Sequence, residues 1–426
     1  MTLLLFLITL IVVILMGVPI AFALLASGVV LMLHLGIFDS QIISQNIING
    51  ANNFSLMAVP FFILAGGLMN AGGLSQRIID FALSLFGHIR GGLGYVVIFA
   101  GVLFAGLSGS AVADTAALGA ILIPMMTKAG YDRGRSTGLI AASGIIAPII
   151  PPSVAMILFG VVSGVSITQL FMAGIVPGIL MALGLTISWW LVCRKDDVET
   201  YPRRSLKEIL IALRKALWAL SMPVVIIGGL RGGIFTPTEA SVVATFIAFV
   251  VGFFIYRELK IPNLYNVLVN AARTTSVVMF LAAAAMVTAW LISIGQVPQM
   301  IAGFLGPFSE NQFLLLIVLI IIILLAGMVM DLVPLILVLT PIVFPIITVA
   351  GIDPVYFGLI FILVNAIGLL TPPVGAVLNV ACGVGNISLE HLMKGIWPFL
   401  ISHLILLLLL IIFPQLVTIP AEWLTR

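Results

Sequence analysis

Two short polar stretches interrupt an otherwise apolar chain, and their side chains are of the kinds that bind small cations. The first, Leu107-Ser-Gly-Ser-Ala-Val-Ala-Asp-Thr115, carries three hydroxyls and one carboxylate among small residues. The second, Met330-Asp-Leu-Val-Pro334, carries one carboxylate. Hard cations prefer oxygen ligands of these kinds, and carboxylates at membrane depth are usually functional. The two stretches therefore predict oxygen-rich sites for a hard monovalent cation.

A proline pair follows each polar stretch. Pro151-Pro152 precedes Ser153, and Pro372-Pro373 follows Thr371. Two consecutive prolines remove two backbone donors and clash with the preceding turn, so a helix must unwind there. Unwound backbone at membrane depth is tolerated only where protein or a water-filled cavity covers it. We therefore expect free carbonyl groups at each proline pair.

The residues by themselves give two groups of candidate cation ligands. They are Ser108, Gly109, Ser110, Asp114, Thr115 and Ser153 in the first group, and Asp331, Thr371, Gly375 and Asn379, with Asn365 nearby, in the second. The alternative is structural, because hydroxyls and amides also cap half-helices or bond across helices. Either carboxylate can likewise lie at the positive N-terminus of a half-helix without touching an ion. Neither stretch contains an Arg or Lys that would bind an anion.

The features occur twice because the chain contains the same segment twice. Residues Ala105 to Pro177 fall on Ala326 to Pro398 when they are shifted by 221 positions without a gap. Roughly a quarter of the positions are identical, and most of these are Gly, Pro or Asp, which determine backbone shape rather than bulk hydrophobicity. We interpret this as an internal duplication.

Composition indicates a membrane protein. Of the 426 residues, 62% are hydrophobic and 8% are charged, and the mean hydropathy is +1.33. Soluble proteins carry about 25% charged residues, so we predict an all-α polytopic protein whose partner is the lipid bilayer. The net charge of +3 gives no reason to expect a nucleic-acid partner. We expect no disulfide, cofactor or metal cluster and no enzyme, because the sequence lacks metal-ligand spacing, a phosphate-binding loop and a nucleophile motif.

Each repeat is predicted to contain three spans, a re-entrant hairpin, a broken helix and a last span. The predicted units are residues 1–192 as the first repeat, with its hairpin at about 93–127 and broken helix at about 135–164, residues 193–216 as a cytoplasmic linker, residues 217–415 as the second repeat, with its hairpin at about 314–348 and broken helix at about 356–385, and residues 416–426 as a C-terminal tail. A single straight helix over either hairpin would be about 50 Å long, too long to cross once. Residues 1–35 form either two helices or one kinked helix.

Charge predicts that the repeats are inverted. The flanks of the first hairpin carry Arg77, Arg90, Lys128, Arg133 and Arg135, whereas the flanks of the second, residues 295–313 and 349–357, carry no Lys or Arg. By the positive-inside rule, the first hairpin enters from the cytoplasm and the second from the outside.

The number of crossings agrees with this inversion. Five crossings per repeat turn the second copy upside down and place both termini on the periplasmic side. The linker is then cytoplasmic, as are the basic residues Arg257, Lys260, Arg273 and Lys394. Inverted repeats with broken helices are typical of secondary transporters, so we expect the substrate between the two hairpin tips.

Several long motifs resemble one family over essentially the whole chain. In order, they are NGANNFSLMAVPFFILAGGLMNAGGLSQRI, LSGSAVADTAALG, GIIAPIIPPS, GGIFTPTEAS, GMVMDLVPLILVLTPI and GLLTPPVG. They resemble the large membrane subunit of tripartite ATP-independent periplasmic (TRAP) transporters. The resemblance implies an elevator-type, sodium-driven permease of the bacterial inner membrane. It also implies that the permease pairs with a small membrane subunit of about four helices and receives an organic acid from a periplasmic solute-binding protein.

The resemblance also extends the candidate sodium sites. It implies sodium binding among Ser108, Gly109, Ser110, Asp114, Thr115, Pro151 and Ser153, and among Met330, Asp331, Thr371, Pro372, Gly375 and Asn379. The substrate class it implies is a carboxylate or sugar acid such as diketogulonate. Two alternatives remain: a stand-alone sodium/dicarboxylate-type symporter that needs no binding protein, and an intramembrane enzyme, for which the tips offer Ser and Asp but no His or Lys partner.

Overall fold

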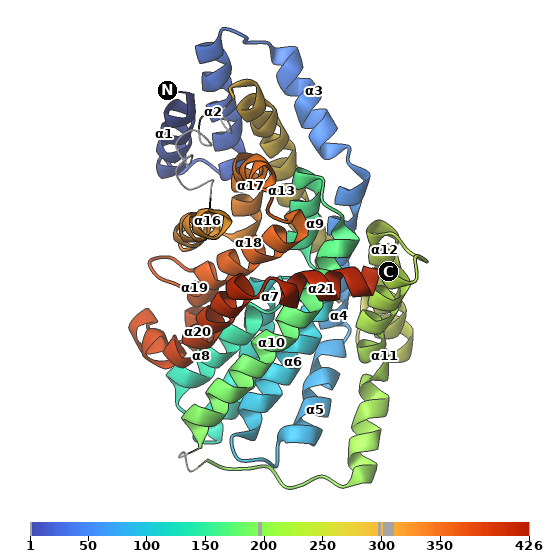
Figure 1. Ribbon diagram of the computed structural model, residues 1–426. Coiled ribbons are helices and arrows are strands. Elements are labelled where there is room, and N and C mark those ends of the chain that lie inside the picture. The colour runs from blue at the N-terminus through green and yellow to red at the C-terminus, as the bar shows by residue number, and fades with distance from the viewer. Residues whose placement is uncertain (1, 195–197, 297–299, 301–310, 426) are drawn as a thin grey trace.

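The computed structural model of the chain describes residues 2–194, 198–296, 300 and 311–425 (Figure 1). Throughout this part the regular elements are helices, and eight of the described helices are long and apolar enough to cross a membrane. The prediction of an all-α polytopic membrane protein is confirmed.

The helices follow the same order in both halves. The first half contains α1 (Thr2–Leu15), α2 (Ile20–Leu35), α3 (Ser40–Ala51), the 3-10 turn η1 (Phe54–Met57), α4 (Ala58–Ala71), α5 (Leu74–Phe86), α6 (Gly92–Ser108), α7 (Ala111–Lys128), α8 (Arg133–Gly144), α9 (Val154–Ser163) and α10 (Ile167–Cys193). The second half contains α11 (Leu206–Arg231), α12 (Pro237–Val250), the π-helical turn η2 (Val251–Ile255), α13 (Ile261–Ile294), α16 (Gln312–Gly327), α17 (Leu332–Val349), α18 (Pro354–Gly368), α19 (Ala376–Gly385), α20 (Leu389–Ile412) and α21 (Gln415–Thr425). Part of the second hairpin's N-terminal flank, residues 297–299 and 301–310, lies outside the described residues.

Two helices, rather than one kinked helix, form the N-terminal region. Gly17 has a φ of 82°, in the left-handed region that favours glycine, and Pro19 is the N-cap residue just before α2. The two helices then pack against each other.

The segments predicted as a linker and as a C-terminal tail both contain helix. The second half of the expected linker belongs to α11, which begins after Ser205 with a capping box. The Ser205 hydroxyl accepts the Glu208 N–H, and the Glu208 carboxylate accepts the Ser205 N–H at 2.7 Å. The stretch expected as a C-terminal tail is helix α21, which packs against α10. The basic residues indicated a cytoplasmic linker, but the capping box at Ser205 starts helix α11 within it.

Hairpins and broken helices lie where the polar stretches and the proline pairs occur. Only residues 109 and 110 separate α6 from α7, and residues 328–331 separate α16 from α17. Helix α8 ends at Gly144 and α18 ends at Gly368, each several residues before a proline pair joined by a cis peptide bond. The chain becomes helical again at α9 and α19.

The equivalent segments of the two halves run in opposite directions. A Cβ atom on Gly50 of α3 would lie 2.9 Å from Met286 of α13, and one on Gly67 of α4 would lie 3.0 Å from Val267 of α13. Contacts therefore move backward along α13 as they move forward along α3 and α4. Since α13 is the repeat equivalent of these elements, the two copies are antiparallel, as inversion requires.

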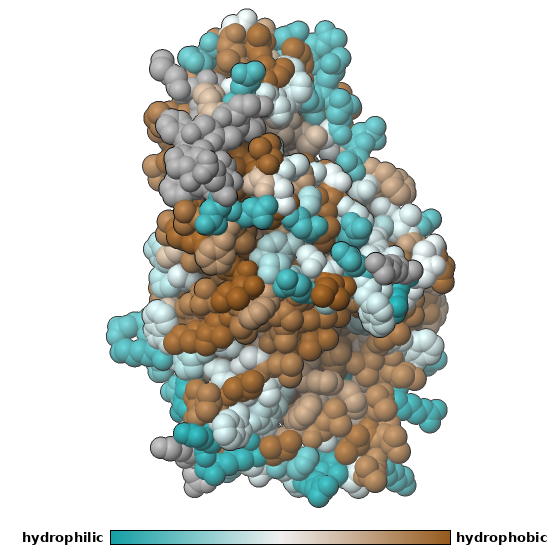
Figure 2. All heavy atoms as spheres, viewed as in Figure 1, coloured by the Kyte–Doolittle hydropathy of each residue, from teal (hydrophilic) through white to brown (hydrophobic). Residues whose placement is uncertain are grey.

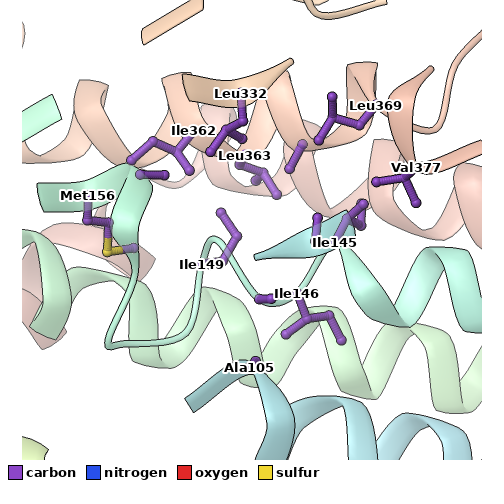
Figure 3. Close-up of a cluster of buried hydrophobic side chains, with 14 of the residues drawn as sticks. Ala105, Ile145, Ile146, Ile149, Met156, Leu332, Ile362, Leu363, Leu369 and Val377 are labelled. Atoms are coloured by element: carbon purple, nitrogen blue, oxygen red, sulfur yellow. The ribbon is translucent and has the colours of Figure 1, made fainter. Parts of the chain in front are cut away.

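Other contacts are exchanged between the halves in the same way. Helix α7 packs against α19 and α17 against α9, while α8 packs against α20 and α18 against α10. Each hairpin therefore contacts the broken helix of the other half. Figure 3 shows Ile145 and Ile149, from the break after α8, in one buried cluster with Leu363 of α18 and Val377 of α19. This apolar centre holds the two unwound segments together.

The outer surface fits a lipid environment. On the face shown in Figure 2, apolar side chains cover a broad region over α10 and α20, and hydrophilic residues gather below it. Leu183 and Ile187 of α10 are 52% and 61% exposed, and Ile405 of α20 is 53% exposed. Exposed apolar surface of this extent is stable in hydrocarbon but not in water.

Candidate functional site

The first hairpin tip is built around Ser108 and Asp114. Gly109 has a φ of 61°, which turns the chain sharply between α6 and α7. This turn lets the Ser108 hydroxyl donate to Asp114 Oδ1, while Ser108 Oγ accepts the Ser110 N–H at 3.1 Å. Asp114 is 2% exposed, and its Oδ2 has no hydrogen-bond partner among the described residues. A buried carboxylate oxygen without a donor is costly, so this atom is suited to a cation.

The first unwound segment touches this tip through backbone. A Cβ atom on Gly109 would lie 2.8 Å from the Pro152 carbonyl oxygen, and one on Gly106 would lie 3.6 Å from the Pro151 carbonyl oxygen. Both prolines are buried. Carbonyl groups of the break therefore lie beside the tip, where cation ligands were expected.

Ser153 has a clear structural role in the same segment. Its hydroxyl donates to the Pro148 carbonyl at 2.7 Å and accepts the Met156 N–H at 3.3 Å, which caps α9. Thr115 is buried on the far side of α7, where a Cβ atom on Gly144 of α8 would lie 2.0 Å from its hydroxyl oxygen. Thr115 Oγ1 has no hydrogen-bond partner in the described part of the chain.

The second hairpin tip repeats the first with a different cap. Asp331 lies 221 positions after Ser110, and both residues are the N-caps of the second hairpin helix, α17 and α7 respectively. The Ser110 hydroxyl accepts the Ala113 N–H at 3.3 Å, whereas the exposed Asp331 carboxylate makes no capping bond. Hydrogen-bonded capping therefore describes Ser110, while Asp331 lies at the positive N-terminus of α17 without a capping hydrogen bond.

The second unwound segment is tied to this tip by hydrogen bonds. The N–H groups of Val374 and Gly375 both donate to the Met328 carbonyl, at 3.2 and 3.1 Å. The Thr371 hydroxyl donates to the Ile367 carbonyl at 2.9 Å, and the Asn365 amide donates to the Leu332 carbonyl at 3.4 Å. Backbone contacts thus hold the second break against the second tip.

Both tips open onto one cavity of about 950 Å³. Of the candidate ligands, Ser108, Gly109, Ser110, Asp114 and Asp331 line it. The other candidates are not among the residues that line the cavity; they are Thr115, Pro151, Ser153, Met330, Asn365, Thr371, Pro372, Gly375 and Asn379. The structure thus brings both polar stretches to a shared space, as the inverted repeats predicted, and places the proline pairs in supporting positions.

The cavity is also lined by polar residues that were not among the candidates. Asn70 of α4 and three residues of α13, Asn270, Arg273 and Thr274, line it. From the sequence, Arg273 indicated only membrane topology, as one of the basic residues expected on the cytoplasmic side. Positions 270, 273 and 274 lie on one helical face, so their spacing could have indicated a functional surface once a continuous helix was assigned there.

These features define the class of protein. Two antiparallel copies of one helical fold, with two hairpin tips and two broken helices around a common cavity, are the architecture of a membrane transporter. The chain belongs to the family described as "Tripartite ATP-independent periplasmic transporter, DctM component", which it matches over residues 7–416. The resemblance to TRAP large permeases is therefore confirmed.

Relatives support this assignment along the whole chain. The 2,3-diketo-L-gulonate TRAP transporter large permease protein YiaN of Escherichia coli is 50% identical over 96% of this chain and 96% of its own length. The sialic acid TRAP transporter large permease protein SiaM of Vibrio cholerae is 39% identical, over 94% of this chain and 93% of its own. The C4-dicarboxylate TRAP transporter large permease protein DctM of Pseudomonas aeruginosa is 38% identical over 88% of each chain. These relatives are permeases rather than enzymes.

One solved structure shares the fold. The crystal structure of the YdaH transporter of Alcanivorax borkumensis has a TM-score of 0.64 to this chain and covers 88% of it, with 87% of the YdaH chain covered in turn. The sequences are 14% identical, so the likeness concerns fold alone.

Proposed function

We propose that this chain is the large permease subunit of a sodium-driven TRAP transporter that takes up an organic acid across the bacterial inner membrane. The observation that carries the proposal is the single cavity onto which both hairpin tips open, with Asp114 and Asp331 at its edge. The named substrates of the three relatives, 2,3-diketo-L-gulonate, sialic acid and C4-dicarboxylates, are all carboxylates. A carboxylate or sugar acid is therefore the proposed substrate.

Sodium is the proposed coupling ion, bound and carried at the tips. The fit rests on the buried Asp114 oxygen that has no partner in the described chain, and on the Pro151 and Pro152 carbonyls beside Gly106 and Gly109 of the same hairpin. At the second tip, the Asp331 carboxylate is not used in capping and faces the cavity. Hard oxygen ligands of this kind suit sodium, and each ion offsets the charge of a carboxylate at membrane depth.

The proposed partners follow from family membership. They are a small membrane subunit of about four helices and a periplasmic solute-binding protein that delivers the acid. Both termini are proposed to lie on the periplasmic side, with the basic linker in the cytoplasm. In an elevator mechanism, the hairpins and broken helices would move together past α4 and α13 and carry the tips between the two faces.

Reconstitution tests the proposal. The chain is placed in proteoliposomes with its small subunit, the solute-binding protein is added outside, and uptake of 2,3-diketo-L-gulonate, sialic acid and succinate is measured. We expect uptake of at least one acid only under an inward sodium gradient. Equal uptake with potassium or choline in place of sodium would disprove sodium coupling. Equal uptake without the solute-binding protein would instead indicate a stand-alone sodium/dicarboxylate-type symporter.

A further inference from the structure

One face of α13 lines the cavity onto which the hairpin tips open. The cavity-lining residues of this helix are Val267, Asn270, Ala271, Arg273, Thr274, Val277, Val278 and Leu281. They recur every three or four positions, which places them on one side of the helix. The face is polar around Asn270, Arg273 and Thr274 and apolar from Val277 to Leu281. A small acid with a charged end and a carbon skeleton would match this division.

Arg273 is the cation of this cavity. It is the single Lys or Arg among the residues that line the cavity, which otherwise carries the carboxylates of Asp114 and Asp331. Arg273 is exposed, and it has no ion pair or hydrogen bond with any residue that the structure describes. It also lies in a helix that is long and apolar enough to cross the membrane. An arginine in such a helix normally faces water or pairs with an anion and marks a ligand pathway.

Arg273 has no charged equivalent in the first repeat. Shifting Arg273 back by 221 positions gives Asn52, which follows the end of α3 and does not line the cavity. In the first half the chain breaks at this point, whereas in the second half α13 continues through 34 residues. The unbroken helix is what carries Arg273 to the cavity. Arg273 is thus an addition to the duplicated framework rather than a product of it.

We propose that Arg273 binds a carboxylate of the transported acid, with the amide of Asn270 and the hydroxyl of Thr274 beside it. This inference rests on the proposed function, since it names the group that recognises the proposed substrate. A guanidinium presents two parallel N–H donors that match the two oxygens of a carboxylate. Sodium at the tips would offset the charges of Asp114 and Asp331, which leaves Arg273 as the charge that attracts the anionic end of the acid. The rival reading is that Arg273 pairs with Asp331 when the cavity closes.

Binding to the purified complex tests the proposal separately from transport. Affinities for 2,3-diketo-L-gulonate and succinate are measured by calorimetry at saturating sodium, for the parent and for Arg273→Gln, Arg273→Lys and Lys260→Gln. Lys260 is an exposed basic residue at the start of the same helix, outside the cavity, and serves as the matched control. We expect Arg273→Gln to weaken binding roughly 10- to 100-fold, the effect of losing a charge-assisted hydrogen bond.

Two further readouts separate binding from a structural role. Arg273→Lys should recover part of the affinity, because it keeps the charge but loses the fork geometry. Arg273→Gln should also lose the parent's preference for succinate over succinamide, while its sodium half-saturation and melting temperature stay those of the parent. Lys260→Gln should behave like the parent throughout.

Several outcomes would overturn the inference. Unchanged acid affinity in Arg273→Gln would remove Arg273 from the site. A changed sodium half-saturation with unchanged acid affinity would indicate that Arg273 pairs with Asp331 instead. A parent that binds none of the acids would overturn both the inference and the proposed function. A parent that binds acid through Arg273 but shows no sodium-driven uptake would overturn the proposed function alone.

Discussion

At the scale of single residues, the two hairpin tips are equivalent in position but different in chemistry. Ser110 and Asp331 are both N-caps, yet only Ser110 bonds to its helix. Asp114 has no equivalent carboxylate, because the residue 221 positions later is Leu335. The negative charge is therefore buried next to Ser108 in the first tip and exposed to the cavity in the second. The two proposed sodium sites should differ accordingly in their response to mutation.

Asp331→Ala should raise the sodium concentration for half-maximal uptake roughly tenfold, since a charged ligand is lost without loss of a capping hydrogen bond.

Ser110 needs a comparison of two variants, because Ala removes both the hydroxyl and the cap, whereas Gly preserves most of the capping stability. If Ser110 binds sodium, Ser110→Ala and Ser110→Gly should raise the half-saturation equally. A normal value in Ser110→Gly would mean that Ser110 acts only as a cap.

Ser108→Ala should destabilise the first tip, because it removes the donor to Asp114 and leaves that carboxylate with neither oxygen bonded. The expected cost is about 1–3 kcal/mol, seen as a lower melting temperature of the purified complex. Saturating sodium should recover part of the loss if the ion contacts Asp114. Thr127→Ala, in helix α7 of the same hairpin, removes only a bond to the Ile123 carbonyl and is the control. An equal loss in both variants would contradict the assigned role of Ser108.

At the scale of elements, the contact between a hairpin tip and an unwound segment depends on close backbone approach. Gly109 combines a left-handed φ with a neighbouring carbonyl, that of Pro152, where a Cβ atom would be 2.8 Å away. Gly375 in the second break also has a positive φ, of 50°, and its N–H is bonded to the second tip. Both glycines permit close backbone approach, which places the Pro152 carbonyl beside the first tip and bonds the second break to the Met328 carbonyl.

Gly109→Ala should reduce sodium-driven uptake severely, because the new methyl group would force the tip away from Pro152. Gly130→Ala is a matched control: Gly130 also has a positive φ, of 90°, but a Cβ atom there would meet nothing within 4 Å. Both variants carry the backbone cost of about 1 kcal/mol or more for a left-handed alanine. Uptake and sodium half-saturation should change only in Gly109→Ala, and parallel losses in the two variants would argue against a special contact at the tip.

At the scale of the whole molecule, the antiparallel packing of α13 on α3 and α4 places equivalent ends of the two halves on opposite sides. Helices α7 and α17 end at equivalent residues, Lys128 and Val349, which are both exposed. In the proposed transport function, this symmetry would allow one cavity to be reached from either face in turn. It also allows the two halves to differ locally, as they do at Arg273 and Asn52, without loss of the common framework.

Cysteines placed at positions 128 and 349, in a background with Cys193 and Cys382 changed to Ala, should label from opposite faces of the membrane. A membrane-impermeant thiol reagent added to intact cells after removal of the outer-membrane barrier should modify Val349→Cys and not Lys128→Cys. Inside-out vesicles should give the reverse. Modification of both positions from the same face would refute the inverted arrangement.

The sequence determined more of the framework than of the site. Gly, Pro and charge patterns act locally, so the hairpins, the unwound segments and the break at Gly17 to Pro19 were predictable within a few residues. Helical capping is also local, but the capping residues Ser205 and Glu208 lie within the basic stretch that was interpreted as a linker. The long helix α13 was not predicted as one continuous element, because polar residues interrupt the apolar pattern in its first half.

Only the tertiary structure decided which polar groups share a space. Ser153 and Asp331 are similar candidates in the sequence, yet the Ser153 hydroxyl caps α9 whereas Asp331 lines the cavity. Arg273 and the hairpin tips are far apart along the chain, and only the packing of the two halves brings them to one cavity. Local rules fix the backbone of a segment, but the partner of a buried charge depends on contacts between segments, and those exist only after folding.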